Sequence, residues 1–217
     1  MRVLGLIPAR SGSKGMKDKN IKEFRGKPLL AHSIESALRS GVCDEVFVCT
    51  DSEKYACIAR EFGASVPFLR SEESARDESK SIECVIESLE RYKERGEEFD
   101  VVILLQPTSP LRNEVHIKEA YEKFVRFGCE DLASVCESVE NPLFMRRIIE
   151  DRLQNLLLLS SSVRRQDLQK CYVLNGAIYI NLASRLTPQT SFNDNPLSYV
   201  MSREVSLDID EEGDFIK

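Results

Sequence analysis

The chain has few of the residues on which several common catalytic and metal sites depend. Its 217 residues include two histidines, His32 and His116, too few for a His-rich metal site and an argument against a Ser-His-Asp triad. We expect both histidines to lie in helices without a catalytic role. The seven cysteines form no CxxC pair and no zinc-like spacing. This pattern favours reduced, mostly buried thiols and a cytoplasmic location.

Long apolar runs and an excess of basic residues are also missing. The run after Met1-Arg2 is too short for a signal peptide, and no stretch approaches the length of a membrane span. The net charge of -6 argues against binding to nucleic acid or to a membrane surface. With 42% hydrophobic residues the chain can fill one sizeable core, so we predict a single domain over residues 1–217.

Short runs of Val, Ile and Leu alternate with amphipathic segments. Strands are expected at 3–8, 45–50, 101–105 and 132–136. Helices are expected from Pro28 to Gly41, from Ile82 to Gly96 and from Ile117 to Gly128. In the first helix, Leu30, Ile34, Ala37 and Leu38 should share one core-facing stripe. The alternation predicts an α/β fold, a mostly parallel, Rossmann-like sheet wrapped by helices.

Polar turns follow the first three predicted strands. They comprise Arg10 to Asn20, Thr50-Asp51-Ser52, and Gln106 to Ser109. In parallel sheets, ligands bind beyond the carboxyl ends of the strands. We therefore expect these three turns to meet at one edge of the sheet and to form a binding site there.

The first of these turns carries the strongest chemical signal. Residues 7–20 read IPARSGSKGMKDKN, with several cations, two glycines and two serines in one loop. Glycines let the backbone approach a ligand, while hydroxyls and cations bind phosphate oxygens. The spacing matches neither the Walker loop nor G-x-G-x-x-G. The loop indicates a nucleoside triphosphate site, and an ordinary basic surface turn is the alternative.

A second signal lies near the end of the chain, in SLDID. Asp208 and Asp210 alternate along an expected strand and should therefore point to the same face. Paired carboxylates with substrate phosphates suit Mg²⁺. Because Glu211, Glu212 and Asp214 follow, a solvated acidic turn is the other interpretation.

The pattern changes after about residue 138. Residues 139–172 have mixed periodicity and include the apolar run from Leu156 to Leu159. We expect an inserted arm or hairpin whose apolar stretch meets a partner subunit.

Four stretches in order resemble the acylneuraminate cytidylyltransferases, the CMP-sialic acid synthetases. They are IPARSGSKG followed by Lys19-Asn20, LLQPTSPLR (104–112), NGAIYI (175–180) and SLDIDEEGDF (206–215). The resemblance implies a nucleotidyltransferase sheet and Mg²⁺-dependent transfer of CMP from CTP to the anomeric hydroxyl of a nonulosonic acid, with release of pyrophosphate. It also implies a homodimer in which the 139–172 arm reaches the neighbour's active site.

The resemblance assigns site residues by motif. For the nucleotide it implies Ala9, Arg10, Ser13, Lys14, Lys19, Asn20, Arg70 and Ser81. For the sugar it implies Gln106, Thr108, Ser109, Arg112, Arg165, Gln166, Asn175 and Phe192. Asp208 and Asp210 would hold the metal, and Arg10, Lys19, Asp208 and Asp210 would be the catalytic set.

Two departures fall on the sugar side. Position 144 is Phe where some family members carry a lysine nearby, and Val173-Leu174 stand where some have an arginine. They leave the acceptor open between N-acetylneuraminic and legionaminic acid. Pseudaminic acid, Kdo and a non-catalytic nucleotide-binding protein on the same fold are the remaining alternatives.

Overall fold

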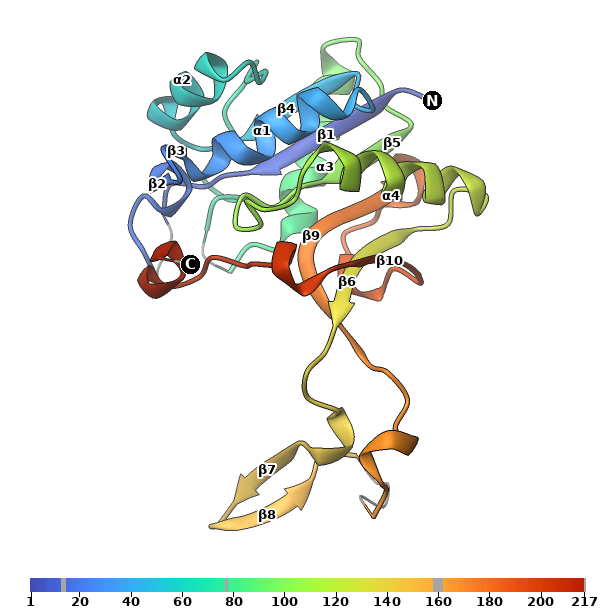
Figure 1. Cartoon of the computed structure of the whole chain (residues 1–217). Helices are drawn as coiled ribbons and strands as arrows, with labels where there is room; N and C mark the ends of the chain where they lie inside the picture. The colour runs from blue at the N-terminus through green and yellow to red at the C-terminus, as the bar shows by residue number, and fades with distance from the viewer. Residues whose placement is uncertain (13–14, 77, 158–161, 217) are drawn as a thin grey trace.

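The centre of the molecule is a six-stranded sheet (Figure 1). The computed structural model describes residues 1–12, 15–76, 78–157 and 162–216. The strands of the sheet are β1 (Val3–Pro8), β4 (Glu45–Cys49), β5 (Val101–Leu104), β6 (Leu132–Glu137), β9 (Tyr172–Leu182) and β10 (Leu197–Met201). Their spatial order is β10-β6-β9-β5-β1-β4. Only β9 among these strands runs against its neighbours, so the predicted mostly parallel α/β sheet is confirmed.

Four helices cover the two faces of the sheet. They are α1 (Leu29–Ser40), α2 (Glu53–Glu61), α3 (Ser81–Glu94) and α4 (Glu114–Arg126). The predicted helices correspond to α1, α3 and α4, and they contain His32 and His116 as expected. The sequence analysis missed α2. No helix in the described ranges is long and apolar enough to cross a membrane.

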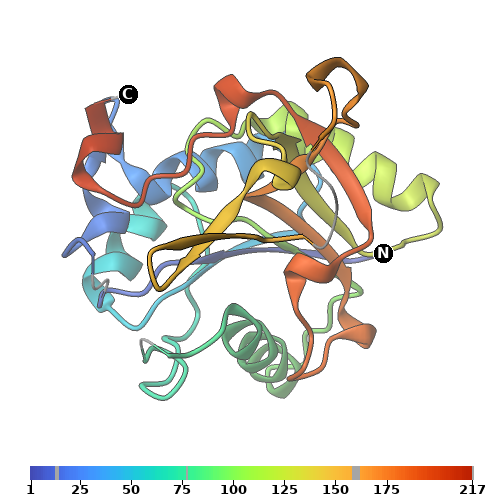
Figure 2. The same ribbon diagram turned by 90° about the horizontal axis from the view of Figure 1, so that it is seen from below.

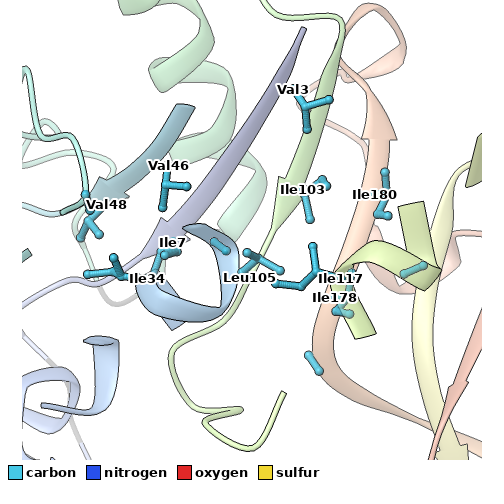
Figure 3. Packing of buried hydrophobic residues seen from close by; sticks show 14 of the residues in the cluster. Val3, Ile7, Ile34, Val46, Val48, Ile103, Leu105, Ile117, Ile178 and Ile180 are labelled. Carbon is cyan, nitrogen blue, oxygen red and sulfur yellow. The ribbon is translucent and has the colours of Figure 1, made fainter. Parts of the chain in front are cut away.

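The alternation of strand side chains decides which helix packs on which face. In β1, Val3 and Ile7 point into a core shared with α1, α2 and α4 (Figure 3). Leu4 and Leu6 point to the other face, where α3 packs. Figure 2 shows α3 on the opposite side of the sheet from α1 and α4. Leu38 is exposed and not part of the core stripe, because it lies beyond the edge of the face that α1 buries.

Short elements complete the chain. The small sheet joins β2 (Glu23–Phe24) to β3 (Lys27–Pro28). The 3₁₀ helices are η1 (Lys19–Ile21), η2 (Pro142–Phe144), η3 (Arg165–Asp167), η4 (Ala183–Arg185), η5 (Phe192–Asp194), η6 (Arg203–Val205) and η7 (Glu212–Ile216). All seven cysteines are free thiols; three are buried and Cys57 is exposed.

The segment between β6 and β9 projects from the sheet as an arm (Figure 1). Its hairpin pairs β7 (Arg146–Ile149) with β8 (Arg152–Asn155). The two turn residues, Glu150 and Asp151, both have positive φ, as a type I′ turn requires. Ile148 and Leu153 face each other across the hairpin and are both 72% exposed. Of the predicted apolar run, Leu156 and Leu157 are exposed, while residues 158 and 159 lie outside the described residues.

Candidate functional site

A cleft opens at the carboxyl ends of β1 and β5, where the sequence places its polar turns. Its volume is about 260 Å³. It is lined by Pro8, Arg10, Lys19, Asn20, Arg70, Ser79, Lys80, Ser81, Cys84, Gln106, Pro107 and Thr108. The turns after β1 and β5 thus share one cavity, whereas the turn after β4, predicted to join them, does not line it and instead binds the loop after β1 through Asp51.

The loop after β1 is held by hydrogen bonds from three parts of the chain. Asp51, in the turn after β4, accepts from the Ser11 backbone N–H and from its hydroxyl, both at 2.8 Å. The buried Asn20 amide donates to the Arg10 carbonyl over 3.1 Å. Ala9 is buried, and its N–H donates to the Cys49 carbonyl. These bonds fix the start and end of the loop.

The far end of the same loop is tied to α2. Asp18 has φ 57° and precedes η1. Its carboxylate accepts from the Tyr55 hydroxyl at 3.1 Å and pairs with Lys54 at 3.2 Å. The two bonds hold the pKa of Asp18 below its usual range. The next residue, Lys19, is thereby directed into the cleft.

On the opposite wall, Arg70 and Ser81 line the cleft beside α3. Arg70 is buried, and its Nε donates to the Ser74 hydroxyl over 3.3 Å. The Glu87 carboxylate, on α3, accepts from the Ser71 N–H at 2.7 Å and from the Ser74 hydroxyl. Glu87 therefore organises the loop that presents Arg70. The sequence analysis missed it because it looks like any solvated helical glutamate.

The Asp208–Asp210 segment contacts two residues of the cleft lining, Lys19 and Thr108, but it is not a strand. The Ile209 N–H donates to the Thr108 carbonyl over 2.8 Å, and residues 208–210 form no strand in the described structure. The expected strand is therefore wrong, because the segment has no neighbouring strand to form a ladder with. The expected alternation survives: Ile209 is fully buried, and both aspartates are exposed on the other side.

The two aspartates differ in their electrostatic environment. Asp210 forms an ion pair with Lys19, with 3.1 Å between Oδ1 and Nζ. Although Asp208 reaches solvent, the surrounding loops desolvate its carboxylate, and this raises its pKa above the usual range. Repulsion from Asp210 acts in the same direction, whereas a hydrogen bond from Thr108 and the charge of Lys19 oppose it.

A second cavity of about 420 Å³ adjoins the cleft. It is lined by Ser79, Lys80, Ser81, Ile82, Leu104, Gln106, Tyr179, Gln189, Thr190, Ser191, Phe192 and Asn193. Ser79, Lys80, Ser81 and Gln106 line both cavities. The rings of Tyr179 and Phe192 pack 5.8 Å apart between centroids. The charge of Asp208 reaches Tyr179 and helps to raise the pKa of its phenol, after the larger effect of burial.

Comparison with known proteins identifies the family of this chain. A sequence profile described as Cytidylyltransferase matches residues 4–143. The chain belongs to the cytidylyltransferase family.

Curated relatives and a solved structure extend the comparison. An N-acylneuraminate cytidylyltransferase of Streptococcus agalactiae serotype V is 40% identical over all of this chain and 52% of its own length, so the chain spans about half of that relative. The CMP-N,N'-diacetyllegionaminic acid synthase of Legionella pneumophila is 40% identical over 97% of this chain and 90% of its own length. A CMP:2-keto-3-deoxy-manno-octonic acid synthetase in complex with CTP covers 98% of this chain and 95% of its own, with a TM-score of 0.72 at 15% identity. That last likeness shows the fold alone.

Most residues expected at the nucleotide meet in the cleft. Arg10, Lys19, Asn20, Arg70 and Ser81 all line it. Ala9 is not in the lining of the cleft, and its backbone N–H is bonded to the Cys49 carbonyl. Ser13 and Lys14 lie outside the described residues.

Three residues expected to contact the sugar are instead enclosed in the fold. Arg112 is 1% exposed, and its guanidinium donates to the carbonyls of Gln106 and Ala177 and to the Ser33 hydroxyl. Burial lowers the pKa of Arg112 to about 9. Ser109 is fully buried, and its hydroxyl donates to the Asn175 carbonyl. The expectation of direct contact is corrected for these side chains, because they hold the turn after β5 against β9.

Asn175 is the third of these enclosed residues. Its Oδ1 accepts from the Ser134 hydroxyl at 2.6 Å, and its Nδ2 donates to the Ser206 hydroxyl at 2.9 Å. It lies where the pairing of β6 with β9 shifts register. Gly176 follows with φ +69°, and a Cβ there would lie 3.2 Å from Oε1 of Gln106. The Asn-Gly pair therefore shapes the wall behind Gln106 instead of touching a ligand.

Gln106 lines both cavities, Phe192 lines the second and Thr108 lines the first, so contact of these residues with the sugar stays a prediction. Arg165 and Gln166 lie in η3 of the arm, away from the cleft of their own chain (Figure 1). The sequence analysis missed Lys80, Tyr179 and, in the 189–193 loop, every residue but Phe192. Tyr179 could have been found within NGAIYI, since in a strand it points to the opposite face from Ile178 and Ile180, whereas Lys80 and the loop carry no local signal.

The carboxylates at the site could hold a hard cation such as Mg²⁺ only if a bound substrate supplied further oxygen ligands. Within the described ranges, no group of three or more His, Cys, Asp or Glu side chains is arranged to bind a metal ion. Asp208 and Asp210 offer two carboxylates whose mutual repulsion a cation would relieve. Mg²⁺ commonly binds through one or two carboxylates, with water and substrate phosphates as its other ligands. The residues fit such an ion brought in with a triphosphate.

Proposed function

We propose that the chain transfers CMP from CTP to the anomeric hydroxyl of a nonulosonic acid, N-acetylneuraminic or legionaminic acid, and releases pyrophosphate. The observation that carries the proposal is the pair of adjoining cavities: one is rich in cations, the other is largely neutral, and Gln106 lies in both. The relatives named for N-acylneuraminate and for N,N'-diacetyllegionaminic acid support this acceptor class.

The cation-rich cleft would take the nucleotide. Arg10 and Lys19 would neutralise the phosphates, and the buried Asn20 keeps the loop in place. Arg70 and Ser81, on the other wall, would bind the cytosine edge, with Glu87 fixing their loop. Phosphoryl transfer depends mainly on such positioning and charge neutralisation.

Asp208 and Asp210 would hold Mg²⁺, which when bound supplies charge neutralisation at the phosphates. To bind the ion, Asp210 must give up its ion pair with Lys19, and the freed lysine can then bind the leaving pyrophosphate. The carboxylate of Asp208 is desolvated, which raises its pKa, and a nearby cation would stabilise its charged form.

The second cavity would hold the acceptor, with its anomeric hydroxyl directed past Gln106 toward the α-phosphorus. That oxygen attacks in line, the bond to pyrophosphate breaks, and the proton of the hydroxyl passes to solvent water. Tyr179 and Phe192 offer an apolar surface for the acyl group, and the neutral polar side chains of residues 189–193 suit hydroxyls.

We further propose a cytoplasmic homodimer joined through the arm. The exposed Ile148 and Leu153 offer an apolar surface for a partner subunit. Arg165 and Gln166 of one subunit would then reach the acceptor of the other. The free cysteines agree with a reducing compartment.

Pyrophosphate release with CTP and Mg²⁺ tests the proposal. The acceptors are N-acetylneuraminic, legionaminic and pseudaminic acid and Kdo, each assayed with CTP and with ATP as the base control. We expect release with CTP and one of the first two acids well above the rest. Preference for pseudaminic acid or Kdo would overturn the acceptor assignment. No release with any acceptor, together with CTP binding by calorimetry, would support a non-catalytic binder.

A further inference from the structure

The wall between the two cavities carries one charged side chain. Of its four shared residues, Ser79, Ser81 and Gln106 are neutral and Lys80 is a cation. Every other side chain that is described in the lining of the second cavity is also neutral. The second cavity therefore has a single charge, and it lies on the side that faces the nucleotide cleft.

Lys80 is also available to bind a ligand. It is exposed at the start of α3, and among the described residues its hydrogen bonding is limited to its backbone carbonyl, which accepts from the Glu83 N–H. Over the described part of the chain, its ammonium group lies within ion-pair distance of no carboxylate. Lys19, by contrast, is engaged by Asp210, and Arg70 by Ser74.

The chemistry of the proposed acceptor places its own charge at this wall. In a 2-keto acid sugar, the carboxylate is bonded directly to the anomeric carbon that carries the attacking hydroxyl. If that hydroxyl faces the nucleotide cleft, the carboxylate must lie within one bond of the same place. An anion held at the boundary of a largely neutral cavity needs a cationic or hydrogen-bonding partner there.

We propose that Lys80 binds the carboxylate of the acceptor and thereby selects 2-keto acid sugars over neutral ones. This inference rests on the proposed function, because it takes the second cavity as the acceptor site. It assigns the role to a residue of the same subunit that holds the nucleotide. Lys80 acts here as a binding and specificity residue, and it takes no part in proton transfer.

The test compares an acid with its neutral counterpart. The substrates are the preferred nonulosonic acid and its C1 amide, and the enzymes are the wild type, Lys80→Met and Lys80→Arg. Lys118→Met, an exposed lysine on α4 outside both cavities, is the matched control. Thermal unfolding of each variant checks that the fold is kept.

We expect Lys80→Met to lower kcat/KM for the acid by about 10- to 100-fold, the usual effect of a lost charged hydrogen bond. The kcat/KM for the amide and the KM for CTP should stay nearly unchanged, so the preference for the acid over the amide is lost. Lys80→Arg should restore part of that preference, and Lys118→Met should behave like the wild type.

Two results would overturn the proposal. If the preference for the acid survives in Lys80→Met, the carboxylate is bound elsewhere. If kcat/KM falls equally for the acid and the amide while the KM for CTP rises, Lys80 binds the phosphates of the nucleotide. Failure of the proposed function is a separate result, since it is seen in the wild type alone as no turnover with any nonulosonic acid.

Discussion

Lys19 and Asp210 form an ion pair across the mouth of the cleft, with 3.1 Å between the ammonium nitrogen and the carboxylate oxygen. They come from opposite ends of the chain, one from the loop after β1 and the other from the segment before η7. The pair joins a residue assigned to the triphosphate with one assigned to the metal. Both charges are therefore kept at the site before any ligand arrives.

Replacing Asp210 should abolish turnover and leave the fold nearly unchanged. Its side chain is 72% exposed, and an exposed ion pair contributes at most about 1 kcal/mol. We expect Asp210→Ala to reduce kcat by at least about 100-fold, because charge at the phosphates is no longer neutralised. Glu212→Ala is a matched control, since Glu212 pairs with Lys22 of the same loop. Near-normal turnover in Asp210→Ala would refute the metal role.

The raised pKa of Asp208 predicts a pH-dependent cost to stability. A carboxyl group with a raised folded pKa binds more protons in the folded state, so stability falls as the pH rises from its unfolded pKa through its folded pKa. Asp208→Asn cannot ionise and avoids this loss. Unfolding midpoints should therefore favour Asp208→Asn over the wild type above this window and not below it. An advantage independent of pH would contradict the assignment.

Arg112 should be a determinant of stability. Arg112→Met leaves the carbonyls of Gln106 and Ala177 without their guanidinium donor inside the fold. We expect a loss of about 3 kcal/mol or more in the free energy of unfolding, measured with denaturant. Arg39→Met, an exposed arginine on α1, should cost less than about 1 kcal/mol. If Arg112→Met is as stable as the wild type and has a raised KM for the acceptor, Arg112 contacts the sugar directly after all.

Asp51 should act on nucleotide binding through the loop it holds. Asp51→Ala removes both acceptors of Ser11, so the loop after β1 loses its anchor on the turn after β4. We predict an increase of about tenfold in the KM for CTP, equivalent to a hydrogen bond or two. The KM for the acceptor should change little. Glu53→Gln provides the control, because Glu53 pairs with Arg60 on α2; an equal effect there would argue against a specific anchor.

The arm should control the oligomeric state. Ile148→Asp places a charge in the apolar pair with Leu153, which we propose to be covered by a partner subunit. Sedimentation should show a shift from dimer to monomer together with a loss of activity. Val115→Asp changes an exposed apolar residue on α4, far along the chain from the arm, and should leave the dimer intact. A wild type that sediments as a monomer would refute the proposed assembly.

Local signals were enough for much of the fold and for the nucleotide side. β1, β4, β5 and β6 were found because each is a short apolar run, and the ends of such strands carry the site in a parallel sheet. Lys19, Arg70 and Gln106 lie where their motifs indicated. The strand β9 was missed as an element because Asn175 and Gly176 interrupt its apolar run.

The sequence by itself determined the family, the α/β alternation and the charged loop, because these depend on residues close together in the chain. Tertiary structure alone decided which side chains of a motif face a ligand. In QPTSPLR, Gln106 faces both cavities while Arg112 turns inward, since the carbonyls it binds come from β9 and from its own turn. It also decided that Lys80 and Tyr179, about a hundred residues apart, line one cavity. No sequence periodicity predicts that these two residues are neighbours, because the packing of α3 on the sheet brings them together.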